Sequence, residues 1–147
     1  MFRGQFEHTV DAKGRVSLPA RFRDALEGTE RWVVTPALFD SCLHVYPEKA
    51  WCALEEKIAE LPSMDPHVVR FRRLYVSAAC ECELDKAGRI LVPPHFRERA
   101  KLGSEVLWAG MGKHAELWSR LEWQRALDVS AEEEASFKKA VLEQMKI

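Results

Sequence analysis

The stretch Asp11-Ala-Lys-Gly-Arg15-Val-Ser-Leu-Pro19-Ala-Arg-Phe-Arg23 occurs a second time as Asp85-Lys-Ala-Gly-Arg89-Ile-Leu-Val-Pro93-Pro-His-Phe-Arg97, 74 residues further along a chain of 147. Asp, Gly, Arg, Pro, Phe and the final Arg hold the same places in both copies. The offset is half of the chain length, so each copy opens one half of the protein. A repeat of this period with only two copies indicates a duplicated domain and not a solenoid.

The similarity continues more loosely beyond the motif. The segment 43–47, Leu-His-Val-Tyr-Pro, corresponds to Ala-Glu-Leu-Trp-Ser at 115–119. The segment 32–35 corresponds to 105–108. We therefore expect a first repeat with its helix at 1–61, a linking helix at 62–78, a second repeat with its helix at 79–129, and a C-terminal helix at 130–147.

Each motif predicts a β-hairpin followed by a short helix. Asp11 and Gly14 are turn residues between the predicted strands 2–10 and 15–18, because Asp hydrogen-bonds its own backbone and Gly adopts the left-handed conformation. Asp85 and Gly88 have the same roles between 79–84 and 89–92. The helices are expected to begin after Pro19 and at Pro94, and to end at glycines, near 27–29 and at Gly103.

Four further strands and four further helices complete the prediction. The strands are expected at 32–35, 42–46, 105–109 and 115–118. A helix opening at Pro47 would bury Trp51, Leu54, Ile58 and Leu61. The next should begin at Asp65-Pro66, and the last two at the capping boxes of Ser119 and Ser130. The final helix has an apolar stripe, which we expect to pack on its own domain, with a neighbouring subunit as the alternative: Phe137, Val141, Leu142 and Met145.

Composition indicates an ordinary globular chain, with 47% hydrophobic and 31% charged residues. The apolar runs are too short to span a bilayer, and the N-terminus lacks the apolar stretch of a signal peptide. We expect a cytoplasmic protein. The four cysteines are interpreted as buried, reduced thiols, although Cys80-Glu-Cys82 could in principle bind a metal.

No catalytic constellation is apparent in the sequence. The five histidines are dispersed, and no phosphate loop or H-x-x-x-H spacing occurs. His44 and Cys42 share a strand face, as do Glu81 and Glu83, but neither pair makes a site without a third group. We therefore expect no enzymatic activity, no metal and no cofactor.

The net charge of −1 neither favours nor excludes nucleic acid, but its distribution is uneven. Residues 1–23 contain five basic and two acidic side chains, whereas residues 80–99 contain four of each. A negatively charged partner of the hairpins should therefore bind mainly to the first copy.

These residues resemble a known family. Met1-Phe-Arg-Gly4 with Asp11-x-Lys-Gly-Arg15-Val-Ser-Leu-Pro19 is similar to the start of MraZ proteins, and the second motif to their second repeat. The resemblance implies an α+β fold of two tandem AbrB-like (SpoVT/AbrB) halves, whose hairpins interlock into a double-split β-barrel. Such a fold agrees with the residues, since an isolated hairpin is only marginally stable.

The resemblance also implies a function. MraZ proteins are bacterial transcription regulators of the division and cell-wall gene cluster, which includes their own gene. They form rings and bind short repeated sites upstream. The expected partners are double-stranded promoter DNA and further copies of the chain, on the nucleoid. A ring-forming scaffold that does not bind DNA is the alternative.

The basic residues of the motifs are the candidate DNA contacts. Arg15 and Arg89 either bind phosphates or guanine edges, or form ion pairs with Asp11 and Asp85 four residues away. Asp11 could also hold Arg15 extended for such a contact. Arg70, Arg72 and Arg73 are expected to form ion pairs with nearby acidic helices, with contact to DNA as the alternative. The remaining candidates for phosphate contacts are Lys13, Arg3, Arg21, Arg23 and Lys86.

Overall fold

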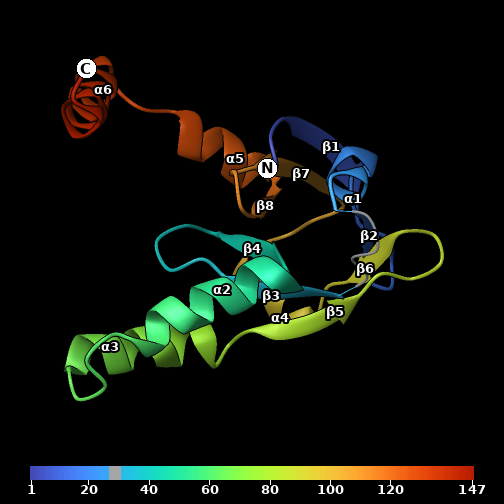
Figure 1. Cartoon of the computed structure of the whole chain (residues 1–147). Helices are drawn as coiled ribbons and strands as arrows, with labels where there is room; N and C mark the ends of the chain where they lie inside the picture. Colours follow the sequence, from blue (N-terminus) through green and yellow to red (C-terminus); the bar gives the residue numbers. More distant parts are fainter. Residues whose placement is uncertain (27–30) are drawn as a thin grey trace.

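The computed structural model describes residues 1–26 and 31–147, which form two antiparallel sheets with helices around them (Figure 1). The first half contains β1 (Gln5–Thr9), β2 (Arg15–Ser17), α1 (Ala20–Asp24), β3 (Arg31–Pro36), β4 (Cys42–Pro47) and α2 (Glu48–Ala59). The link contains α3 (Pro66–Phe71) and a π-helix, η1 (Arg72–Val76). The second half contains β5 (Cys80–Glu83), β6 (Arg89–Leu91), α4 (Pro94–Arg99), β7 (Glu105–Gly110), β8 (Ala115–Ser119), α5 (Arg120–Leu127) and α6 (Ala131–Met145).

The sheets have the symmetry of the duplicated sequence. The large sheet has the order β1-β7-β8-β4-β3-β5, and β2 pairs with β6. In the duplicated sequence, β1 corresponds to β5, β2 to β6, β3 to β7 and β4 to β8. Replacing each strand by its equivalent gives the same order counted from the opposite edge of the sheet. An approximate twofold axis therefore passes between β4 and β8, where His44 lies opposite Glu116, and between β2 and β6, where Val16 lies opposite Ile90.

The predicted local hairpins are replaced by exchange between the halves. Among the described residues, β1 and β2 are connected by the bridge between Val10 and Val16 and the backbone hydrogen bond from Asp11 to Arg15, while β1 pairs with β7, β5 with β3, and β2 with β6. The physical reason is that a two-stranded hairpin cannot bury enough apolar surface alone, whereas strands from both repeats enclose a shared core. The α+β fold with two interlocked AbrB-like halves is confirmed.

The main core lies between the large sheet and the β2–β6 pair. Its largest fully buried side chains are Trp32, Trp108, Phe22 and Phe96. Phe22 makes edge-to-face contacts with Phe2, Phe6 and Trp108. Aromatic pairs of this geometry add roughly 0.5–1.5 kcal/mol each to the burial of their area. Each of the short helices α1 and α4 therefore contributes one buried phenylalanine to the shared core.

Three boundary predictions need correction or fall outside the described residues. The glycine expected to end the first short helix, near 27–29, lies outside them. α4 ends at Arg99, and the residue in left-handed conformation is Lys101 (φ 55°) and not Gly103, because the N–H of Leu102 bonds back to Arg97. Leu61 is exposed beyond the end of α2, while Trp51 and Ile58 are buried as predicted.

α6 does not pack on its own domain as predicted. The helix stands apart from the sheets at the end of an extended connection (Figure 1), and its residues are exposed. About half of the Phe137 surface (51%) and of the Val141 surface (49%) is accessible. The amphipathic pattern predicted a buried face, but this face has no partner within the described chain.

The cysteines and tryptophans follow the predictions in part. Cys42 and Cys82 are buried, but Cys80 is half-buried and Cys52 is exposed on α2, so only two thiols belong to the core. Four of the five tryptophans are buried, and Trp123 is half-buried. No described helix combines the length and the apolar character needed to cross a membrane.

Candidate nucleic-acid interface

The first motif builds a compact turn around one carboxylate. Asp11 Oδ1 accepts hydrogen bonds from the backbone N–H groups of Lys13 and Arg15 at 3.0 and 2.9 Å. Asp11 Oδ2 accepts from Arg15 Nε at 2.7 Å. The bond from the Arg15 N–H is the main reason why the pKa of Asp11 lies below its ordinary value. Gly14 closes the turn at φ 89°, a conformation that side chains other than glycine rarely adopt.

The second motif repeats this turn. Asp85 Oδ1 accepts from the N–H groups of Ala87 and Arg89, and Asp85 Oδ2 accepts from Arg89 Nε, all at 2.9 Å. Gly88 has φ 75°, and the pKa of Asp85 is lowered mainly by the Arg89 N–H. Both ion pairs expected as one alternative from the sequence are therefore formed. The carboxylate hydrogen bonds and the left-handed glycine together explain how the sequence D-x-x-G-R specifies a turn.

The two turns face each other across the β2–β6 ladder. The N–H of Leu18 donates to the carbonyl of Gly88, and the N–H of Val92 donates to the carbonyl of Gly14. Arg89 Nη1 lies 3.8 Å from Asp11 Oδ2, so the ion pairs of the two repeats adjoin. The tertiary structure thus brings Arg15 and Arg89, 74 residues apart in sequence, to one surface.

The ion pair leaves part of the Arg15 guanidinium available. Asp11 engages Nε, and none of the hydrogen bonds among the described residues uses the Nη groups of Arg15. The two Nη groups of an arginine can bind the O6 and N7 acceptors of guanine or two phosphate oxygens. The two interpretations of Arg15 are therefore compatible, because Asp11 can orient the side chain whose outer edge meets a partner.

The structure groups most of the other predicted residues with the turns. Lys13 and Lys86 are exposed in the turns themselves. Arg23 is exposed at the end of α1, and its guanidinium lies against Gly88. Arg21 is exposed on α1. The backbone of Arg3 lies against Gly110 at one end of the β1–β7 ladder, whereas Val10 bonds to Ser104 at the other end, so β1 separates Arg3 from the turn at Asp11.

Arg97 also belongs to this surface, although it was not among the candidates chosen from sequence. Its guanidinium lies against Gly14 as Arg23 lies against Gly88, and its buried Nε has no hydrogen-bond partner among the described residues. A shallow pocket beside it is lined in part by Asp11 and Ser104. The signal was present, since Arg23 and Arg97 occupy equivalent places in the repeated motif.

The arginine cluster of the link does not form the expected ion pairs. None of the ion pairs between described residues includes Arg70, Arg72 or Arg73. Arg72 instead donates from Nη2 to the backbone carbonyl of Ile58 at 3.0 Å, which ties the link to the end of α2. The same carbonyl also accepts from the backbone N–H of Leu61 at 3.1 Å, and the negative end of the helix dipole favours a cation at this position.

A third group joins Cys42 and His44, which the sequence did not predict. Glu116, from the second repeat, lies beside both residues, and its Oε2 is 3.2 Å from His44 Nε2. Pairs within one strand are visible in sequence, whereas this contact joins β4 to β8 and was therefore missed. The cluster lies on the large sheet and not among the basic turns.

The fold and the paired turns define a protein with two AbrB-like halves that exchange their hairpin strands. Comparison with known proteins identifies the family. The family model described as "MraZ protein, putative antitoxin-like" matches residues 1–74 and 76–144. The chain belongs to the MraZ family, as its motifs indicated.

Curated relatives agree over most of the chain. A protein of Carboxydothermus hydrogenoformans is 50% identical over 123 residues, which cover 84% of each chain. One of Desulforamulus reducens is 45% identical over 137 residues, which cover 93% of this chain and 92% of the relative. One of Heliobacterium modesticaldum is 46% identical over 125 residues, 85% of each. All three are named transcriptional regulator MraZ, and none of these names is that of an enzyme. The names agree with the expectation from sequence that the chain is a regulator and has no enzymatic activity.

Proposed function

We propose that the chain is a transcriptional repressor that binds double-stranded DNA sequence-specifically through its two facing D-x-x-G-R turns. Membership of the MraZ family supports the role in transcription. The main structural support for the DNA contact is that Arg89 Nη1 lies close to Asp11 Oδ2. This contact places both turns on one surface. The DNA would be the promoter region of the division and cell-wall gene cluster, and the protein would act in the cytoplasm, on the nucleoid.

The charge of the surface supports contact with phosphates. Lys13, Lys86 and the two motif arginines outnumber the carboxylates of Asp11 and Asp85. Neutralising phosphates releases counterions, which gives affinity without sequence preference. Base edges would be read by the Nη groups of Arg15, and less by Arg89, since one Nη of Arg89 lies near a second carboxylate. The first turn would therefore dominate, as its more basic flanks also predict.

Several copies of the chain would act together. The exposed apolar stripe of α6 supports self-association, because it lacks a partner within the described chain. A ring of identical chains would present the same pair of turns repeatedly, which suits short direct repeats in a promoter. Each contact can then be weak, with affinity arising from several at once.

A salt titration of DNA binding tests this proposal. Intact protein, Arg15→Ala and Arg89→Ala would be compared on the DNA upstream of the protein's own gene and on scrambled DNA. Lys57→Ala removes a charge from an exposed site on α2 and is the matched control. We expect preference for the upstream DNA and a steep salt dependence, whose slope becomes shallower by about 0.9 for each phosphate that a variant no longer neutralises. Arg15→Ala should have the largest effect and Lys57→Ala none.

Two results would contradict the proposal in different ways. If the intact protein bound no DNA even at low salt, a ring-forming scaffold would be the better interpretation. If Lys57→Ala weakened binding as much as Arg15→Ala, the protein would bind through general charge and not through the turns. Equal affinity for one isolated site and for tandem sites would contradict only the multivalent part.

A further inference from the structure

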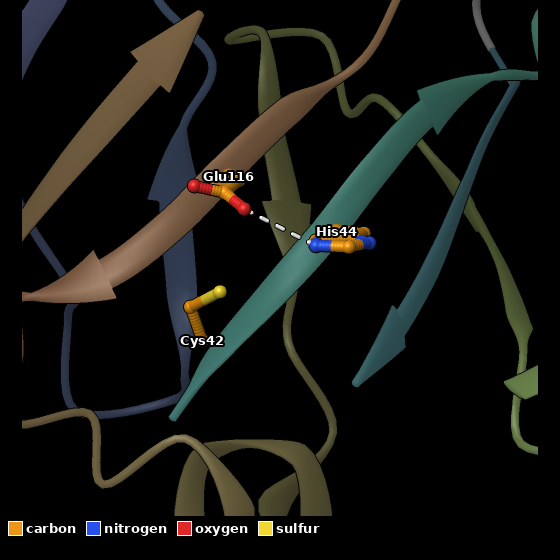
Figure 2. Close-up of side chains that lie close together, drawn as sticks. All are labelled: Cys42, His44 and Glu116. Atoms are coloured by element: carbon orange, nitrogen blue, oxygen red, sulfur yellow. Dashed lines mark hydrogen bonds and ion pairs between the residues drawn. The ribbon is translucent and has the colours of Figure 1, made fainter. Parts of the chain in front are cut away.

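Three side chains of different donor type converge on the large sheet, away from the basic turns. Cys42 and His44 lie two positions apart on the same face of β4, and Glu116 lies opposite His44 on β8 (Figure 2). One thiol sulfur, one imidazole nitrogen and one carboxylate oxygen lie within 4.8 Å of one another. Cys42 and Glu116 are buried, and the His44 side chain keeps 19% of its surface. The cluster is therefore nearly closed to solvent, with His44 on its accessible side.

The surrounding hydrogen bonds orient two of the three donors. His44 Nδ1 lies 2.6 Å from the hydroxyl of Tyr75, which in turn lies 2.8 Å from the hydroxyl of Tyr46. Glu116 Oε1 accepts a hydrogen bond from Trp118 Nε1 at 3.1 Å. These contacts leave His44 Nε2 and Glu116 Oε2 pointing toward each other. Histidine ligands of metals are commonly held in this way, by a hydrogen bond at the other ring nitrogen.

We propose that Cys42, His44 and Glu116 form a binding site for a divalent transition-metal ion, for which Zn²⁺ is the best fit. Thiolate, imidazole and carboxylate together match the borderline character of Zn²⁺, and hard ions such as Mg²⁺ and Ca²⁺ would prefer oxygen donors alone. One thiolate and one carboxylate would also neutralise the charge of the ion inside the sheet.

The geometry requires only small adjustments. With metal–ligand bonds of about 2.0–2.3 Å, ligand atoms of a tetrahedral site lie about 3.3–3.7 Å apart, so rotation of the side chains must close the present spacing by about 1 Å. The tyrosine pair can reverse its hydrogen bonds, so that His44 donates from Nδ1 and binds the ion through Nε2. The thiol proton of Cys42 is released on binding. A water molecule would take the fourth position, on the exposed side of His44.

Such an ion would link the two repeats. His44 and Glu116 occupy equivalent positions of the duplicated sequence, and they meet on the approximate twofold axis between β4 and β8. The ion would bind a residue pair of the first repeat and a single residue of the second. It would stabilise the interlocked fold at a distance from the DNA-binding turns, so this site is independent of the proposed function.

Cobalt titration of the reduced, chelator-stripped, full-length protein tests the site. Co²⁺ replaces Zn²⁺ with the same geometry and gives visible absorption in tetrahedral sites, with a near-ultraviolet charge-transfer band when a thiolate binds. We expect one ion per chain, that band, its loss on adding Zn²⁺, and an increase of Tm with Zn²⁺. Glu116→Gln keeps the shape of the side chain but removes a charged ligand, so it should weaken binding by at least the roughly 10- to 100-fold that loss of a residue supporting a ligand causes.

Matched cysteine variants make the test specific. Cys42→Ala should abolish the charge-transfer band, whereas Cys52→Ala, at an exposed position, and Cys80→Ala should retain it. Persistence of the band in Cys42→Ala, its loss in Cys80→Ala, or failure of the intact chain to bind Co²⁺ at micromolar concentration would overturn the proposal. If Cys42→Ala did not fold, unchanged affinity in a folded Glu116→Gln would overturn it instead.

Discussion

Arg23 of the first repeat lies against Gly88 in the turn of the second, so close that a β-carbon at Gly88 would come within 2.8 Å of the guanidinium carbon. Arg97 lies against Gly14 with the same spacing, 2.8 Å. Each turn is therefore covered by an arginine of the other repeat. This contact explains why the repeated motif extends beyond the turn to an arginine at the end of the short helix.

Replacing either turn glycine should destabilise the protein. Gly14→Ala and Gly88→Ala impose a left-handed conformation on a residue with a β-carbon, which costs about 1–2 kcal/mol, and they also displace the covering arginine. Gly14→Ala should cost more, since its β-carbon would also lie 3.1 Å from the backbone carbonyl oxygen of Val92. Urea denaturation gives the free energy of unfolding.

Gly103→Ala is the matched control, because a β-carbon there would contact nothing within 4 Å. The double variant Gly88→Ala with Arg23→Ala separates the two causes. If removing Arg23 restored the full stability, backbone strain would not be the reason for glycine at this position.

The turns should make stability depend on pH in acid. The folded-state pKa values of Asp11 and Asp85 are lowered, so both carboxylates stabilise the fold above the unfolded pKa, about 3.9, and this stabilisation is lost as pH falls through the folded pKa. The free energy of unfolding should therefore decrease below about pH 4. Asp11→Asn with Asp85→Asn should make this decrease less steep.

Urea denaturation between neutral and strongly acidic pH measures the effect. Asp128→Asn, at an exposed position just after α5, controls for the removal of a carboxylate in general. An acid dependence that is identical in the double variant and in the intact protein would show that the turn carboxylates do not contribute.

Two buried tryptophans should respond differently to the same change. Trp108 donates from Nε1 to the backbone carbonyl of Ser17 at 3.0 Å, whereas Trp32 Nε1 has no partner among the described residues. Both side chains are fully buried. Trp108→Phe removes the donor that the Ser17 carbonyl uses. This substitution should therefore lower the free energy of unfolding by about 1 kcal/mol more than Trp32→Phe does. Equal losses in thermal or urea unfolding would mean that this hydrogen bond adds nothing to stability.

The stripe of α6 should matter for assembly and not for the fold of one chain. Phe137 and Val141 are about half exposed, so Phe137→Ser with Val141→Ser should change the stability of the single chain by less than about 0.5 kcal/mol. Sedimentation velocity should show smaller particles than for the intact protein. Lys139→Ser, a change at a charged position of the same helix, should leave the particle size unchanged. Unaltered particles in the double variant would place the subunit contact elsewhere.

Local features of the structure could be predicted because their hydrogen bonds span few residues. Asp11 binds groups two and four positions along the chain, and Ser130 caps α6 through the N–H of Glu133, three positions along. Asp65 caps α3 through His67 in the same way. In such cases the participating residues lie next to one another in the sequence, so their pattern predicts the contact. The duplication, too, is a property of the sequence alone.

Contacts between the repeats were decided by the tertiary structure. The sequence predicts a strand at 2–10, but it does not predict that this strand pairs with β7 instead of β2, because strands from either repeat can provide the partner. The pairing of β4 with β8 brings Glu116 to Cys42 and His44. The motif therefore determined the form of each turn and the class of the fold. Burial of apolar surface between distant strands determined which turns, arginines and donor groups meet.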